Sequence, residues 1–203
     1  MNTINEVIFD LETQRFFDEA PDPSQFGVSV ISLYTRTLDE NFNEISGEML
    51  SFFEPDVLKS FEYFKKADRI IGFNSKRFDV PVLKPYLPYE FQKFNHFDIL
   101  EHIKEINGKR VSLNAVAKET LGQQKVDEGG NAIIYWKKHD EESLRKLKYY
   151  CEEDVRITKE IYDYGFKNKT LKFKDFWNDI REIDVDFSYP IVEKPEEEQA
   201  SLF

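Results

Sequence analysis

The chain has 203 residues, of which 40% are hydrophobic and 33% are charged, and this suits one α/β domain with a sizeable core. No apolar run reaches the roughly 20 residues that cross a bilayer, and residues 1–10 lack the features of a signal peptide. We therefore expect a cytoplasmic protein with no membrane partner. Its single cysteine, Cys151, excludes an internal disulfide and a cysteine-based zinc cluster, and its net charge of −11 excludes strong DNA binding through charge alone.

The hydrophobic pattern predicts three strands first and then strands that alternate with helices. The predicted strands are 6–12, 28–35, 48–53 and 69–73; the predicted helices are 57–67, 80–86, 99–106, 113–120 and a long one from Glu141 to about Tyr164. Gly165 is expected to end the long helix, and Gly129–Gly130–Asn131 to form a turn. This order predicts a mixed β-sheet flanked by α-helices, in a single domain spanning residues 1–190.

A pair of carboxylates ends the first predicted strand. Side chains on a strand alternate between its two faces, so Asp10 and Glu12 share one face while Phe9 and Leu11 share the other. Two neighbouring carboxylates repel each other, and a divalent cation removes that repulsion. A strand end that simply emerges into solvent remains the alternative at this point.

Two further groups of polar residues follow along the chain. Tyr150 and Asp154 are four residues apart on the long helix, which places them on one face, one turn apart. Asn74 and Asp79 follow the buried strand at 69–73. The alternatives are that Asp154 lies on a solvated flank of its helix and that Asp79 only caps the next helix.

Together the three groups resemble the motifs of the DEDD superfamily of 3′→5′ exonucleases, which have an RNase H-like fold. The motifs here are D-x-E at Asp10 and Glu12, N-x-x-x-F-D from Asn74 to Asp79, and Y-x-x-x-D from Tyr150 to Asp154. The histidine-bearing branch has a histidine at the position of Tyr149. The sequence is therefore similar to the tyrosine-bearing (DEDDy) branch, which includes the proofreading domains of family B DNA polymerases.

The resemblance implies a catalytic site that holds two Mg²⁺ or Mn²⁺ ions, with Tyr150 orienting the attacking water. The implied metal ligands are Asp10, Glu12, Asp79 and Asp154. The implied substrate is the 3′ end of a single strand, DNA in preference to RNA. The alternatives are an RNA-directed or structure-specific nuclease with the same metal site, and a non-catalytic module that binds nucleic acid or a clamp.

Substrate contacts are expected from Asn74, Phe16 and Phe17. Many relatives have T-G directly after the first motif, where this chain has Thr13 and Gln14 followed by Arg15 and the two phenylalanines. Aromatic rings can stack on terminal bases, although core packing is an alternative for at least one of the two rings.

The segment 191–203 is acidic, and its composition predicts a flexible tail. Its last five residues, Gln-Ala-Ser-Leu-Phe, resemble the motif by which bacterial replication and repair proteins bind the sliding clamp. The resemblance implies that Gln199, Leu202 and Phe203 bind such a clamp, and this would bring an acidic enzyme to DNA in replication or repair. Packing of the tail on its own domain, or a chance match, are the alternatives.

Overall fold

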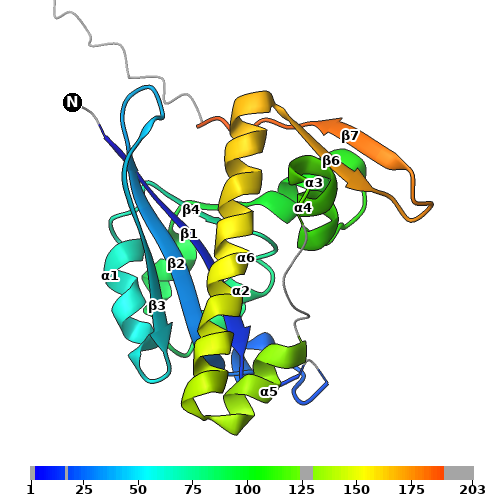
Figure 1. Cartoon of the computed structure of the whole chain (residues 1–203). Helices are drawn as coiled ribbons and strands as arrows, with labels where there is room; N and C mark the ends of the chain where they lie inside the picture. Colours follow the sequence, from blue (N-terminus) through cyan, green and yellow to red (C-terminus); the bar gives the residue numbers. More distant parts are fainter. Residues whose placement is uncertain (1–2, 17, 124–129, 190–203) are drawn as a thin grey trace, which may run out of the picture.

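A five-stranded sheet with the strand order β3-β2-β1-β4-β5 forms the centre of the protein (Figure 1). The computed structural model describes residues 3–16, 18–123 and 130–189. The strands are β1 (Ile4–Thr13), β2 (Val28–Leu38), β3 (Glu44–Phe53), β4 (Arg69–Gly72) and β5 (His96–Asp98). The pairs β1–β2 and β2–β3 are antiparallel, whereas β1–β4 and β4–β5 are parallel. This mixed sheet confirms the predicted α/β fold.

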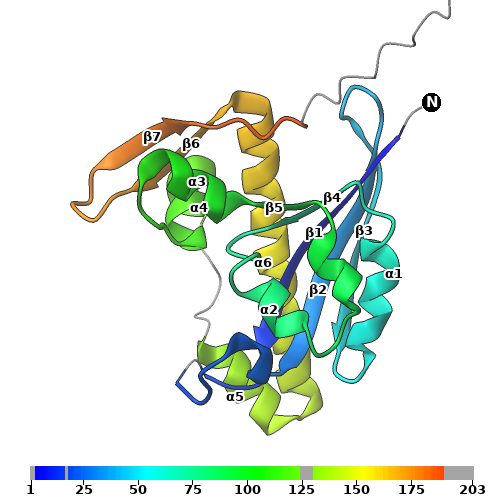
Figure 2. The same ribbon diagram turned by 180° about the vertical axis from the view of Figure 1, so that it is seen from behind.

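Helices cover both faces of the sheet. Helix α6 (Glu141–Asn168) lies across β1 and β2 on one face, and α1 (Phe61–Phe64) and α2 (Asp79–Leu83) lie on the other (Figures 1 and 2). The other helices are α3 (Ile99–Asn107), α4 (Leu113–Leu121), α5 (Gly130–Lys138) and the short 3-10 helices η1 (Pro23–Gln25), η2 (Asp56–Ser60) and η3 (Tyr89–Lys93). In the described residues, no helix is both long and apolar enough to cross a bilayer.

Strand β1 separates two parts of the core. Val7, Phe9 and Leu11 pack into the cluster that faces α1 and α2, and Ile8 packs into the cluster that contains Val155 of α6. Each side chain that is fully buried in this way stabilises the fold by roughly 1.5–3 kcal/mol, so the alternation fixes which face of β1 meets which layer. The residues in phase with Ile8, two and four positions later, therefore point toward α6.

The expectation that Gly165 ends the long helix is wrong. Helix α6 continues to Asn168, and Lys169 ends it in the left-handed conformation, with its N–H donating to the Gly165 carbonyl. Gly165 is needed for a different reason. A Cβ at this position would lie 2.4 Å from the Phe187 ring, so only glycine lets the C-terminal segment pack this closely against the helix.

The expected turn at residues 129–131 is also corrected. Helix α5 begins at Gly130, and Gly129 lies outside the described residues. Burial of Ala132 and Ile133 favours a helix despite the glycine, with Ala132 packed in the cluster that contains Leu147. The short strand β5 and the hairpin of β6 (Thr170–Lys174) and β7 (Ile180–Asp184) have no counterpart among the predicted elements.

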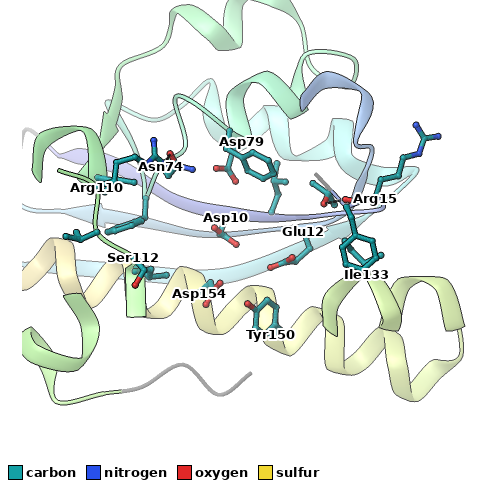
Figure 3. Close-up of a pocket in the computed structure, with 18 residues that line it drawn as sticks. Asp10, Glu12, Arg15, Asn74, Asp79, Arg110, Ser112, Ile133, Tyr150 and Asp154 are labelled. Carbon is teal, nitrogen blue, oxygen red and sulfur yellow. Dashed lines mark hydrogen bonds between the residues drawn. The ribbon is translucent and has the colours of Figure 1, made fainter. Parts of the chain in front are cut away.

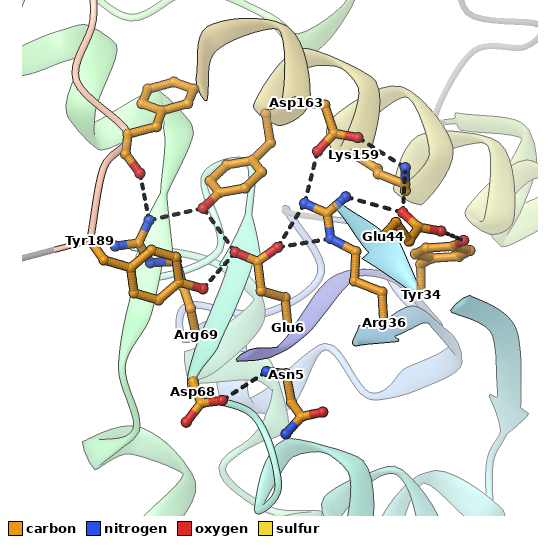
Figure 4. A network of polar contacts seen from close by, with 12 residues as sticks. Asn5, Glu6, Tyr34, Arg36, Glu44, Asp68, Arg69, Lys159, Asp163 and Tyr189 are labelled. Carbon is orange, nitrogen blue, oxygen red and sulfur yellow. Dashed lines mark hydrogen bonds and ion pairs between the residues drawn. The ribbon is translucent and has the colours of Figure 1, made fainter. Parts of the chain in front are cut away.

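A buried polar network joins β1, β2, β4, α6 and the C-terminal segment (Figure 4). At its centre the Glu6 carboxylate, 1% exposed, pairs with the Arg36 guanidinium at 2.7 Å. The same carboxylate accepts hydrogen bonds from the hydroxyls of Tyr162 (3.1 Å) and Tyr189 (2.6 Å). Arg69 donates to the Tyr162 hydroxyl at 2.8 Å. The network therefore fastens the segment after β7 to the sheet.

Candidate active site

Three carboxylates from β1 and α6 meet on one face of the sheet. One oxygen from each of Asp10, Glu12 and Asp154 lies within 4.8 Å of the other two (Figure 3). The alternation of β1 turns the first two toward α6, and α6 places the third opposite them. Cys151, which is buried one turn before Asp154, donates its thiol to the Asp10 carbonyl at 3.4 Å. This contact fixes the helix against the strand beside the carboxylates, and burial raises the pKa of that thiol, as expected of a core residue.

Asp79 lies on the other side of the same cavity, at the first position of α2. It is not the helix cap, because the cap position is Phe78 and no side chain caps this helix. Burial, together with the negative charges of Asp98 and Asp154, raises the pKa of Asp79 to about 8. Among the described residues, its buried Oδ1 oxygen has no hydrogen-bond partner. A buried carboxylate oxygen that lacks a donor, facing other carboxylates across a cavity, fits a cation ligand.

The cavity between these elements has a volume of about 490 Å³ and combines acidic and apolar walls. Tyr150 lies one helical turn before Asp154 and is 5% exposed, so its ring is packed while the residue still borders the cavity. The apolar part of the lining is formed by Leu11, Phe16, Phe73, Phe78, Leu100, Val111, Leu113 and Ile133. Apolar walls around a few convergent polar groups are typical of a ligand site.

Asn74, expected to contact substrate, also borders the cavity. Its backbone is left-handed (φ 68°), and its N–H donates to Asp98 Oδ1 at 2.8 Å. The same Asp98 oxygen accepts from the N–H groups of Leu100 and Glu101, so Asp98 caps α3, as its position before that helix predicts. Asp98 thus holds the Asn74 loop and is not among the residues that line the cavity.

Phe16 is 39% exposed and forms part of the cavity wall, with Lys137 Nζ 5.3 Å from its ring centre. Phe17 and the three tail residues Gln199, Leu202 and Phe203 lie outside the described residues. Three residues that the sequence did not indicate also line the cavity: Arg110, Ser112 and Ile133. None of these three belongs to a recognisable motif, and only the fold brings them to the carboxylates.

Carboxylates gathered between the central strand of a mixed sheet and a long helix form a cluster that could hold a divalent metal ion. Residues 7–165 match the family model of the RNase H superfamily, and no curated protein matches the chain at a significant level. The family match covers more than half of the sequence, and the chain belongs to the RNase H superfamily. Its class is therefore a nuclease-type hydrolase that acts on nucleic acid, and such enzymes generally use divalent metal ions.

Proposed function

We propose that this protein is a metal-dependent 3′→5′ exonuclease of the DEDDy type that hydrolyses single-stranded DNA. The observation that carries the proposal is the convergence of Asp10, Glu12 and Asp154 within 4.8 Å, with Asp79 on the wall of the same cavity. These are the four carboxylates that the motif resemblance assigns to the site. Sequence motifs that are far apart along the chain and meet in one cavity support a shared chemical role.

The four carboxylates would hold two Mg²⁺ or Mn²⁺ ions, because hard divalent cations prefer oxygen ligands. Such ions activate water and neutralise the charge that develops on a phosphodiester during in-line displacement. The orphaned Oδ1 of Asp79 supports this assignment from the protein side. The chain itself supplies the position of the reacting groups. Tyr150, one turn from Asp154, would direct its hydroxyl at the attacking water and orient it.

The apolar part of the cavity lining suits a terminal nucleotide. Phe16 and Ile133 lie on its wall, and Ile133 belongs to α5, which packs against α6 beyond Tyr150 (Figure 3). An apolar wall at this place suits the unstacked base of a terminal nucleotide, since an aromatic ring can stack on any base. Release of a nucleoside 5′-monophosphate from the 3′ end would follow.

The test is incubation with 5′-labelled single-stranded DNA and with RNA of the same sequence, in Mg²⁺, Mn²⁺ or EDTA. A ladder that shortens from the 3′ end, faster on DNA and absent in EDTA, is the expected result. Internal cuts would indicate a structure-specific endonuclease, and faster shortening of RNA would indicate that RNA is the preferred substrate. Binding without cleavage in either metal would identify a non-catalytic module.

A second proposal concerns delivery to DNA in replication or repair. Gln199, Leu202 and Phe203 would bind a sliding clamp, and the support is the terminal sequence motif, preceded by an acidic segment. A short peptide that orders on binding gives an affinity of roughly micromolar strength. Titration of a clamp with the full chain and with a chain ending at residue 198 tests this. Equal binding by both would refute it, whereas the truncation should lose binding and keep its rate on free oligonucleotides.

A further inference from the structure

Basic side chains gather at one side of the mouth of the acidic cavity. Lys76, Arg77, Lys104 and Arg110 line a small adjoining hollow of about 80 Å³, together with two acidic residues, Asp98 and Glu101. Arg110 and Asn74 border both this hollow and the active-site cavity. In Figure 3 Arg110 and Ile133 lie on opposite sides of the carboxylates. Arg110 therefore lies at the end of the cavity away from Ile133 of α5, and another basic residue of the lining, Arg15, lies on the Ile133 side.

Arg110 is held in place by a chain of contacts that begins in the core. Its Nη2 donates to Asn74 Oδ1 at 2.5 Å. The Asn74 backbone is anchored in turn by the 2.8 Å bond from its N–H to Asp98. The neighbouring Ser75 is buried so tightly that a Cβ at Gly72 would lie 2.4 Å from its hydroxyl oxygen. An exposed arginine in a loop loses side-chain entropy when it is fixed, and here a rigid turn fixes it at the cavity mouth.

The charges of this surface contrast with those of the whole chain, whose net charge is −11. Lys76 is paired with Glu101 at 2.7 Å. Within the part of the chain that the structure describes, Arg77, Lys104 and Arg110 form no ion pair with an acidic side chain. A guanidinium has five N–H donors, and the bond to Asn74 uses one of them, so the others can bind an anion. An acidic protein that admits a polyanion needs such local positive charge beside its carboxylates.

We propose that Arg110, extended by Arg77 and Lys104, binds the phosphate backbone of the single strand whose 3′ end lies at the carboxylates. The inference rests on the proposed function and adds the direction in which the bound strand runs across the site. The terminal base lies at the apolar wall formed by Phe16 and Ile133, and the upstream backbone leaves over the basic surface next to α3. Arg110 is a positioning residue in this arrangement, because it binds a phosphate upstream of the reacting one.

The experiment compares Arg110→Ala with the intact protein on 5′-labelled single-stranded oligonucleotides of increasing length and on the p-nitrophenyl ester of thymidine 5′-monophosphate. The ester has no upstream phosphate. Loss of one charge-assisted phosphate contact should raise KM for oligonucleotides by about 10-fold, with little change in kcat. The ratio of the oligonucleotide rate to the ester rate should fall by the same factor. The salt dependence of log KM should weaken by about 0.7 per contact removed.

Three further variants sharpen the assignment. Arg110→Lys should restore part of the oligonucleotide affinity, because the charge remains while the forked geometry is lost. Arg77→Ala combined with Lys104→Ala should weaken binding only of oligonucleotides long enough to reach those residues. Arg145→Ala removes an exposed arginine of α6 that lines neither hollow, and it is the matched control expected to behave as the intact protein.

An equal loss on ester and oligonucleotide, or an unchanged salt dependence, would overturn the inference, because Arg110 would then serve only the cavity itself. If the intact protein cleaves nothing, the proposed function fails while the binding surface is still tested. Fluorescence anisotropy with a labelled oligonucleotide in EDTA would then show whether Arg110 contributes to oligonucleotide binding. Weaker binding by Arg110→Ala than by Arg145→Ala would support the inferred phosphate contact. Equal binding by the two variants, or no binding by any form, would overturn it.

Discussion

Strand β1 carries carboxylates toward both of its ends, and their surroundings beside helix α6 are built in opposite ways. At one end Glu6 of β1 faces Arg36 and the hydroxyls of Tyr162 and Tyr189. At the other end Asp10 and Glu12 of β1 face Asp154 of α6. The first arrangement pairs a buried negative charge with a positive charge and hydrogen-bond donors. The second gathers like charges within 4.8 Å of one another.

The Coulomb interaction between the carboxylates of the cluster is repulsive, whereas that between Glu6 and Arg36 is attractive. Two like charges 4.8 Å apart repel by about 3 kcal/mol at an effective dielectric constant near 20, whereas an opposite pair at that distance attracts as strongly. The Glu6 network therefore compensates a buried charge within the protein, whereas repulsion among Asp10, Glu12 and Asp154 is a cost that a bound cation would reduce. A carboxylate's position on a strand or helix therefore does not by itself show whether it has a structural or a functional role.

The largest expected effect is the loss of cleavage when the cluster is changed. Asp10→Asn or Asp154→Asn should lower kcat by at least about 100-fold, because each removes a charge that holds the ions at the reacting phosphate. The same variants should unfold at an equal or higher temperature in EDTA, since they relieve repulsion. Cleavage assays and thermal melts on the same preparations measure both. Near-normal cleavage by Asp10→Asn would refute the site.

A loss of stability without a loss of kcat is expected when the Glu6 network is changed. Arg36→Met leaves Glu6 buried without its cation, and breaking a buried pair from one side destabilises by about 3–5 kcal/mol. Denaturant unfolding measures this loss, and kcat of the remaining folded protein should be unchanged. Glu44→Gln is the matched control, because Glu44 is 31% exposed and its pair with Arg36 is worth about 1 kcal/mol or less.

Metal binding should stabilise the protein through the carboxylate cluster and not through the Glu6 network. Saturation with Mg²⁺ at about 100 times its dissociation constant stabilises the folded state by about 2.7 kcal/mol for one site. The melting temperature should therefore rise with Mg²⁺ in the intact protein and in Arg36→Met, but far less in Asp10→Asn. A similar rise in all three proteins would place the ions elsewhere.

The pH dependence of stability in EDTA follows from Asp79. Its pKa in the folded protein is raised to about 8 from 3.8, so between these values the folded state binds more protons than the unfolded state. Stability should therefore fall as the pH rises from about 4 to 8, by at most about 1.4 kcal/mol per pH unit from this group. Asp79→Asn should flatten that slope in melts taken across this range, and an unchanged slope would show that another group causes it.

The smallest effect is expected from Tyr150→Phe, which removes one hydroxyl and leaves the packed ring. Loss of a single hydrogen bond to the water should lower kcat by about 10-fold. The rise in melting temperature with Mg²⁺ should persist, because no carboxylate changes. If that rise disappears, Tyr150 supports the metal ligands rather than the water.

The carboxylates of the site and the face of β1 that bears them could be predicted from the sequence. The period of two along residues 6–12 places Asp10 and Glu12 together, and the spacing of four pairs Tyr150 with Asp154. Both patterns are local, because strand and helix geometry fix the relation between residues a few positions apart. The mixed α/β sheet follows from the order of the strands and helices for the same reason.

Only the tertiary structure decided which distant residues meet. Arg110 contacts Asn74 across a separation of 36 positions, and Arg36 pairs with the buried Glu6 across a separation of 30 positions. No local sequence pattern encodes contacts at such separations. Gly165 shows the same limit, since its sequence context indicates a helix end while the close approach of Phe187 requires a glycine inside the helix. A local pattern states what a residue can do, and packing against the rest of the chain selects what it does.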